Sequence, residues 1–234
     1  MNSMSNRRYH VHRARQPIIP VADWAQPAWA HADVLGVDQF HPASSSHRPA
    51  TRARMLYDHE RIWIMFHVMD RFVRSVQTEY QSAVYTDSCV EFFVQPRPGK
   101  GYFNFEMNCC GTLLVHYVED STRGPSRALA QSTPLTRESG ESIRIFSTLG
   151  PTVELEISQP VEWTLCCKIP LRVMTDYVGN LAPLEGQTWL GNFFKCGDET
   201  SHTHWASWSP IGRDLNFHQP NCFAPICFDE AQQM

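Results

Sequence analysis

Residues 84–96, "VYTDSCVEFFVQP", decide the fold class, because their side chains alternate in chemistry as those of a β-strand do. A strand sends successive side chains to opposite faces of its sheet. One parity is apolar and typical of a protein core: Val84, Val90, Phe92 and Val94. The other parity mixes carboxyl groups with rings: Tyr85, Asp87, Cys89, Glu91, Phe93 and Gln95. Such a face suits neither a core nor an ordinary solvated surface, so we interpret it as a candidate binding surface.

Short strand patterns continue along most of the chain. Residues 61–70, "RIWIMFHVMD", are apolar on both parities, which predicts a central strand covered on both faces. Residues 101–108 alternate cleanly, and residues 111–118 follow as the second strand of a hairpin. Further strands are predicted at residues 153–158 and 161–171, as a pair, and at 188–198 and 203–210, with a short helix near 170–178. This pattern, with turns rich in Gly, Pro and Ser, predicts an all-β sandwich of two mainly antiparallel sheets.

Length and composition favour one globular domain. The 234 residues suit a single sandwich, which we place at residues 21–230 behind an N-terminal extension at 1–20. Hydrophobic residues make up 42% and charged residues 19%, enough apolar material for a sizeable core. A net charge of -4 provides no basic field for nucleic acid. No apolar run reaches the roughly 18 residues of a membrane helix, so no membrane contact is expected. The start, "NRRYHVHRAR", lacks the apolar run of a secretory signal, and the cellular location stays open.

The eight cysteines do not follow the usual spacing of a structural zinc site. No CxxC motif occurs, and two pairs are adjacent, Cys109-Cys110 and Cys166-Cys167. We expect most of them to be buried free thiols, with disulfides as the alternative. Cys89, on a strand and without a histidine tied to it by sequence, is expected to be inert.

The strands at residues 84–96 and 102–108 are close enough in sequence to pair. Together they offer carboxyl, amide and ring groups on one face: Tyr85, Asp87, Glu91, Tyr102, Asn104, Glu106 and Asn108. Aromatic rings stack on the apolar face of a pyranose, and carboxylates and amides hydrogen-bond to neighbouring hydroxyls. This face therefore suits a sugar site, although the spacing alone favours the alternative, a sheet surface that is merely polar.

Two carboxyl groups side by side also suggest a second function class. A glycoside hydrolase needs an acid and a base or nucleophile that flank the scissile bond, and Glu91 with Glu106 is the obvious pair. A hydrolase also needs a deep cleft, which a compact sandwich of this length rarely provides. We therefore expect no catalytic residues and keep the glycoside hydrolase as the alternative.

Other candidate ligand sets are weaker. His202 and His204 share a parity and could join His218 at a metal, but we favour the alternative that they are polar loop histidines. A structural calcium is conceivable from Asp58, Glu60 and Asp70, which flank the strand at 61–70. Because the turn chemistry of residues 57–60 accounts for the first two, we expect no cofactor beyond that possible calcium.

Taken together, the motifs resemble carbohydrate-binding module family 9, in its bacterial stand-alone branch. The specific parts are "DSCVEFF" (87–93) and the segment from "SWSP" (207–210) to "FH" (217–218), and the looser likeness covers about residues 24–228. The resemblance implies a β-sandwich that binds a mono- or oligosaccharide, often at a reducing end, between two aromatic rings. It also implies a role in the utilisation of polysaccharides.

Specific residues follow from the resemblance. The two rings fall on Tyr85, where a tryptophan is usual, and on Trp208, which leaves Trp205 in the core or at the rim. The glutamate of the family falls on Glu91, and Glu106 stands at or beside a position that is usually arginine. Asn192 and Lys195 fall in the strand that carries further polar ligands. A third interpretation is a degenerate member that binds protein partners through its sheet, which would require blocked aromatic walls.

Overall fold

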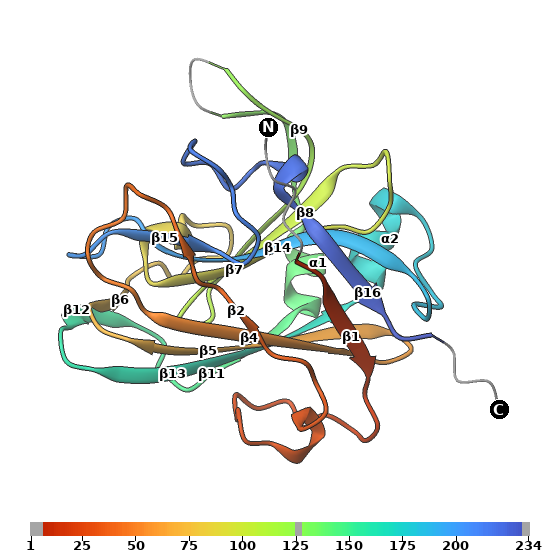
Figure 1. The fold of residues 1–234 in the computed structure, drawn as a ribbon, viewed down its shortest axis with the longest axis horizontal. Helices are drawn as coiled ribbons and strands as arrows, with labels where there is room; N and C mark the ends of the chain where they lie inside the picture. The colour runs from red at the N-terminus through yellow and green to blue at the C-terminus, as the bar shows by residue number, and fades with distance from the viewer. Residues whose placement is uncertain (1–6, 125–127, 231–234) are drawn as a thin grey trace.

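The molecule consists of two packed β-sheets that share a strand along one edge (Figure 1). The computed structural model describes residues 7–124 and 128–230. The first layer contains, in spatial order, β10 (Leu129–Pro134), β9 (Leu113–Arg123), β8 (Tyr102–Asn108), β7 (Cys89–Gln95), β14 (Thr188–Gly197) and β16 (Ala224–Phe228); β15 (His204–Ser207) also pairs with β14, and β3 (Gln39–Phe40) pairs with β15. The second contains β4 (Ala50–Tyr57), β5 (Arg61–Asp70), β13 (Val161–Pro170) and β11 (Arg144–Ser147), with β2 (Leu35–Gly36) on β4. The prediction of a mainly antiparallel β-sandwich is confirmed.

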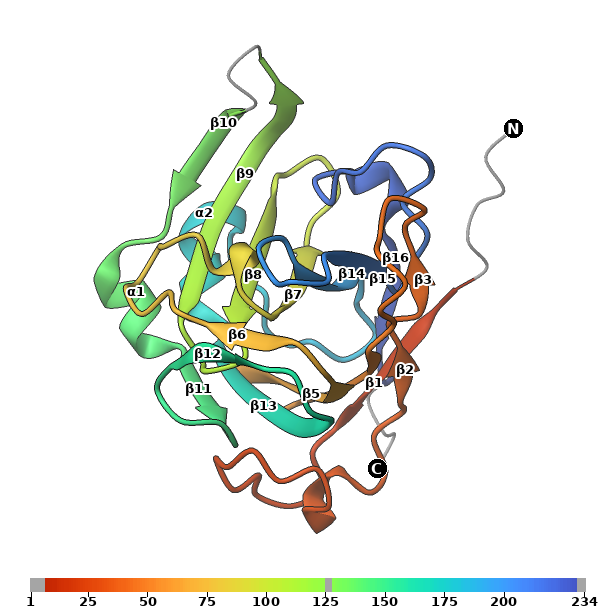
Figure 2. The same cartoon turned by 90° about the vertical axis from the view of Figure 1, so that its left-hand side faces the viewer.

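Smaller elements complete the fold. A separate pair, β6 (Val73–Ser75) and β12 (Val153–Ile157), lies at one end of the sandwich (Figure 2). The helices are η1 (Pro27–Trp29), η2 (Val84–Thr86), α1 (Arg137–Ser142), α2 (Arg172–Val178) and η3 (Pro220–Cys222). The short helix predicted near residues 170–178 is therefore confirmed. In the described part of the chain, no helix has the length and apolarity needed to cross a bilayer.

The core lies between the two layers and explains the alternation in the sequence. Val90, Phe92 and Val94 of β7 point inward and are fully buried with Phe66 of β5 and Trp163 of β13. Burying a side chain of this size contributes about 1.5–3 kcal/mol each. The second parity of β7 therefore faces outward, as the sequence indicates. The strand β5 is central, between β4 and β13, and its outer side chains Trp63 and Met65 enter a second apolar cluster beneath residues 18–32.

Three boundaries differ from the sequence predictions. Residues 84–86 form the turn η2, because Thr86 and Asp87 donate their N–H groups to Ala83 and Val84, and β7 begins only at Cys89. Asp87 does not lie on the binding face: its Oδ2 accepts hydrogen bonds from the backbone of Val76 (3.0 Å) and Gln77 (2.9 Å) and from Asn108 Nδ2 (3.0 Å). Its burial is complete because these donors replace water.

The other two differences concern strand partners. The predicted extension at residues 1–20 contains β1 (Tyr9–Arg13), which pairs with β16 in one layer and β4 in the other, so the fold starts before residue 21; residues 1–6 lie outside the described residues. The strand β12 pairs with β6 and β13 pairs with β5, so the predicted β12–β13 hairpin is wrong. All eight cysteines are free thiols.

Candidate functional site

The outer face of the first layer is covered at one end and bordered by rings at the other. The segment between β15 and β16 crosses the covered end, where Phe217 stacks on Phe194 with ring centroids 4.1 Å apart. Tyr102 Oη and His218 Nδ1 are hydrogen-bonded at 2.7 Å beneath the same segment. At the other end, Cys89 and Cys196 lie under the half-buried side chains of Leu114 and Trp205, and Phe217 reaches over them from the covered end. The candidate site is this second end, beside the covering segment.

Glu91 and Glu106 form the floor of the site. They are directly opposite each other in the β7–β8 ladder, with 2% and 5% of their surfaces exposed. Cys196 Sγ donates to Glu91 Oε1 at 3.1 Å, and Asn104 Nδ2 donates to Glu106 Oε1 at 2.7 Å. Among the described residues, neither carboxyl group forms another hydrogen bond or an ion pair, so each keeps one oxygen for a ligand. The predicted pairing of these two residues is confirmed.

Burial changes the acidity of both carboxyl groups. It raises the pKa of Glu106 to about 7, against the hydrogen bond from Asn104, which lowers it. Burial also raises the pKa of Glu91 well above its ordinary value, and the neighbouring Cys196 and Glu106 raise it further. Both carboxyl groups therefore keep their protons to a higher pH than an exposed glutamate does, because they are buried side by side, although the charge of Arg123 lowers the pKa of Glu106 in part.

Two rings stand at the edge of this floor. Tyr85, carried by η2, is 41% exposed, and its carbonyl oxygen accepts the N–H of Asp198 at 3.1 Å. Asp198 Oδ1 in turn accepts the indole N–H of Trp205 at 2.7 Å. Because Trp205 lies opposite Cys196 in the β14–β15 ladder, its ring is on the same outer face as Glu91. Asp198 thus holds both aromatic residues in place.

Trp208, predicted as the second exposed ring, is buried. It is 3% exposed and packs in the main core, with ring centroids 6.4 Å from Tyr9 and 5.9 Å from Phe193. Trp205 and Trp208 do face opposite sides, as their spacing of three indicates. Trp208 faces the core and Trp205 faces outward, which is the reverse of the prediction. The prediction is wrong because the pairing of β15 with β14 turns Trp205 outward.

Asn192, predicted as a polar ligand, is fully buried and fully bonded. Its Nδ2 donates to Ser209 O at 2.8 Å, and its Oδ1 accepts the N–H groups of Phe193 (2.9 Å) and Ser209 (2.8 Å). These bonds tie β14 to the segment after β15. A side chain engaged in this way has no donor or acceptor aimed at a ligand, so its predicted role is wrong.

Lys195, also predicted as a ligand, points into the sandwich. It is opposite Val90 in the β7–β14 ladder and therefore on the inner face. Its Nζ lies 2.8 Å from His204 Nε2 and 3.4 Å from Asp70 Oδ2, with all three groups buried. This predicted contact is wrong as well, because Lys195 neutralises a carboxylate of the opposite layer.

Protonation of His204, which is buried, and of His218, which is half-buried, is expected to destabilise the fold at acid pH. Burial lowers the pKa of His204 from 6.5 to about 3, helped by the charge of Lys195, and burial lowers that of His218 to the same value, helped by Arg123. Between pH 6.5 and about pH 3 the unfolded chain binds protons at these histidines that the folded chain does not. Their contribution to the free energy of unfolding therefore falls as pH falls. The raised pKa values of Glu91 and Glu106 act in the opposite direction, because the folded chain binds those protons more tightly than the unfolded chain does. Urea unfolding of a Glu91→Gln, Glu106→Gln variant at pH 7 and pH 4.5 isolates the histidines and should show a loss of about 3–5 kcal/mol. Equal stability at both values would contradict this prediction.

The weaker ligand sets do not assemble. Asp58 binds the backbone of Glu60 (2.9 Å) and the indole of Trp63 (3.0 Å) at the start of β5, whereas Asp70 lies at its far end. A strand of that length spans about 30 Å, so the three carboxylates considered for calcium cannot share one ion. The histidines are also separate, since His202 stacks on Phe72 and His204 points into the sandwich.

Trp205, Asp198 and Cys196 are the site residues that sequence reasoning missed. The alternation of residues 188–198 places Cys196 on the same face of the strand as Asn192 and Phe194. It does not show which face is the outer one, because the residues of both faces are largely apolar. Only the partner strands decide which parity faces outward.

Comparison with known proteins places the chain in a family. A crystal structure of a candidate carbohydrate-binding protein from Bacteroides uniformis ATCC 8492 is 26% identical, with a TM-score of 0.81, and the match covers 94% of this chain and 98% of that one. Two structures of a family 9 carbohydrate-binding module from Caldicellulosiruptor kristjanssonii share the fold. The glucose complex is 11% identical with a TM-score of 0.62, covering 96% of this chain and 98% of that one. The cellotriose complex is 13% identical with a TM-score of 0.63, covering 97% and 95%.

Sequence comparison gives the same assignment. No protein of curated function matches the chain. The profile of carbohydrate-binding family 9 matches residues 28–228, which is most of the chain. This protein belongs to carbohydrate-binding family 9.

Proposed function

We propose that this protein binds a mono- or oligosaccharide at the end of the first layer where Tyr85 and Trp205 border Glu91 and Glu106. The observation that carries the proposal is the acidic floor, in which each carboxyl group keeps one oxygen without a partner, beneath two accessible rings. Neither free oxygen is among the fully enclosed polar atoms that lack a partner, so both open toward the outside, where a ligand can reach them. The family and the glucose and cellotriose complexes of its structural neighbours support a sugar as that ligand.

The residues of the site offer two kinds of contact, ring stacking and hydrogen bonding. The rings of Tyr85 and Trp205 offer flat apolar surface for the C–H face of a pyranose. Glu106, with Asn104 fixed beside it, offers hydrogen-bonding atoms for hydroxyl groups. Glu91 lies deeper, with one oxygen engaged by Cys196, and supports the floor. Because Tyr85 is 41% exposed, its ring is accessible, which disfavours a degenerate member with blocked walls.

The geometry supports binding without cleavage. A glycoside hydrolase holds its two carboxyl groups on either side of the scissile bond, one ionised and one protonated. Glu91 and Glu106 instead sit on neighbouring strands of one flat face, and burial raises the pKa of both. Because both pKa values move in the same direction, the pair does not divide into one ionised and one protonated group as a hydrolase pair does. We propose a role in polysaccharide use in which other proteins carry out the hydrolysis.

Titration calorimetry with a panel of glucose- and xylose-based oligosaccharides tests this function. Glu106→Gln should keep the fold and weaken binding by about 1.5–3 kcal/mol, or roughly 10- to 150-fold in Kd, because a hydrogen bond to a charged or polarised acceptor is lost. The exposed Glu154 on β12 offers a matched control, and Glu154→Gln should leave binding unchanged.

The same panel separates binding from catalysis. Incubation of each oligosaccharide with the protein should yield no shortened products by chromatography. Steady turnover that Glu106→Gln abolishes would contradict the proposal and favour the hydrolase.

A further inference from the structure

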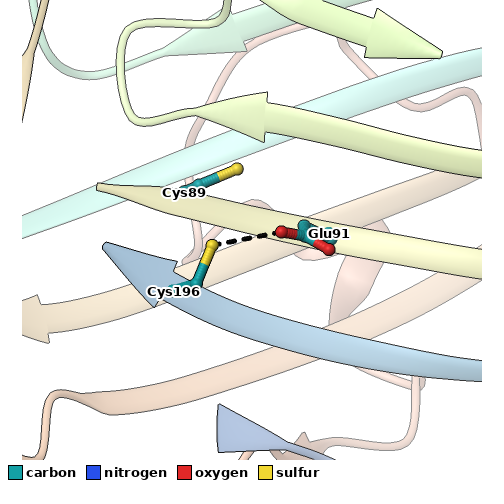
Figure 3. A group of neighbouring side chains, drawn as sticks. All are labelled: Cys89, Glu91 and Cys196. Carbon is teal, nitrogen blue, oxygen red and sulfur yellow. Dashed lines mark hydrogen bonds between the residues drawn. The ribbon is translucent and has the colours of Figure 1, made fainter. Parts of the chain in front are cut away.

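Three metal-binding side chains converge on one point of the outer face. Cys89 on β7 and Cys196 on β14 are directly opposite each other, and Glu91 lies two residues along β7 on the same face. Both sulfur atoms and a carboxyl oxygen of Glu91 lie within 4.8 Å of one another. Figure 3 shows Cys196 directed toward the Glu91 carboxyl group, with Cys89 beside it. We propose that Cys89, Cys196 and Glu91 form a binding site for a thiophilic divalent cation, with Zn²⁺ as the ion expected.

The spacing of the donors suits zinc. A tetrahedral zinc has Zn–S distances of about 2.3 Å and Zn–O distances of about 2.0–2.2 Å, so its sulfur and oxygen ligands lie roughly 3.5–3.8 Å apart. Cys196 Sγ is 3.1 Å from Glu91 Oε1, and it is 3.6 Å from the carbonyl oxygen of Tyr85. The Tyr85 oxygen or a water molecule would complete four-fold coordination. Side-chain rotations that move these atoms by about 1 Å or less would bring the three donors onto an ion.

The site also needs positive charge. Cys89, Cys196 and Glu91 are 0%, 1% and 2% exposed, and Glu106 lies directly opposite Glu91. Among the described residues, no ion pair reaches Glu91, whereas the charge of Arg123 acts on Glu106. Lys195, although next to Cys196 in sequence, points to the other face and toward Asp70 at 3.4 Å. Buried carboxyl groups are normally paired or bound to a metal, and a divalent cation would supply the missing partner.

The donor set determines which cation fits. Two thiolates with one carboxylate form a soft set that prefers zinc over calcium or magnesium, which take oxygen ligands. The opposed thiols also allow a rival state, a cross-strand disulfide, in which an oxidant removes two electrons and two protons. The thiols must therefore be shown to be reduced before metal is added.

The test is a titration of the full chain with Cd²⁺ alone, which reports thiolate ligands by charge-transfer absorption in the ultraviolet. The protein is reduced, freed of reductant under nitrogen and assayed for eight free thiols. Because the donors are buried, a second sample is refolded with the ion present. We expect one equivalent of Cd²⁺ to saturate the absorption and Zn²⁺ to displace it.

Variants locate the site. Cys89→Ala and Cys196→Ala should each weaken binding by about 100-fold or more, beyond the effect of losing an outer partner of a ligand. Glu91→Gln, nearly equal in shape, should weaken it while the fold is preserved, even if a cysteine variant fails to fold. The part-buried Cys110, adjacent to Cys109, provides a matched control, and Cys110→Ala should bind as the parent does.

Two results would overturn the proposal. The first is absence of the absorption in a refolded sample whose thiols are free. The second is an absorption that survives Cys196→Ala or is lost in Cys110→Ala, since it then comes from other thiols. Because the readout is metal uptake without sugar, failure here leaves the saccharide proposal unaffected, and the reverse also holds.

Discussion

Trp205→Ala is expected to weaken saccharide binding severely while the fold remains intact. The ring lies on the outer face, opposite Cys196, and only part of it is packed. Loss of about 100 Å² of apolar contact with a sugar costs roughly 2–3 kcal/mol, or about 30- to 150-fold in Kd. Calorimetry with the tightest oligosaccharide of the panel measures this loss. Trp205→Phe, which keeps a ring, should retain most of the affinity.

Trp208→Ala provides the matched contrast on the other side of the same segment. Trp208 is 3% exposed and packs against Tyr9 and Phe193 in the core. Its truncation should lower the free energy of unfolding by about 3–5 kcal/mol because it leaves a cavity. Protein that remains folded should still bind sugar. Unchanged stability together with abolished binding in Trp208→Ala would contradict the placement of Trp208 in the core and of Trp205 at the site.

Lys195→Met is expected to destabilise the protein by about 3–5 kcal/mol, because it leaves the buried carboxylate of Asp70 without its cation. Lys195 Nζ lies 3.4 Å from Asp70 Oδ2, and both side chains have no exposed surface. Burial alone would raise the pKa of Asp70, but Lys195, with His47, brings it well below its usual value. Chemical unfolding of the variant at pH 7 measures the change.

Two further variants define the origin of this effect. Lys195→Met with Asp70→Asn should regain part of the lost stability, since no charge remains unpaired. Lys168, on β13, is only half-buried, and its Nζ contacts the Trp63 ring at 5.7 Å. Lys168→Met should therefore lower stability by only about 0.5–1 kcal/mol, the usual contribution of such a contact. A stable Lys195→Met that no longer bound sugar would restore the ligand role predicted from the sequence.

The fold class and the floor of the site follow from the order of residues within single strands. The alternation in residues 89–95 and 102–108 separates a core face from an outer face, and the short connection between the two strands makes them neighbours. Glu91 and Glu106 are therefore predicted side by side, and the ladder confirms it. Both results depend on local order along the chain, where the period of two in a strand is sufficient.

Contacts between strands far apart in the chain determine that the Trp205 ring and the Cys196 thiol belong to the site and that the Lys195 ammonium group does not. Trp205 and Trp208 differ in parity, but parity does not say which side is outside. That depends on the pairing of β15 with β14 and of β14 with β7. The same ladders bring Cys196 opposite Cys89 and send Lys195 inward to Asp70 of the other layer. In β14, Phe193 and Phe194 are both apolar, so its two faces have the same hydrophobic signal. Only contacts between strands far apart in sequence fix the face of each residue, because a shift of one position would exchange them all.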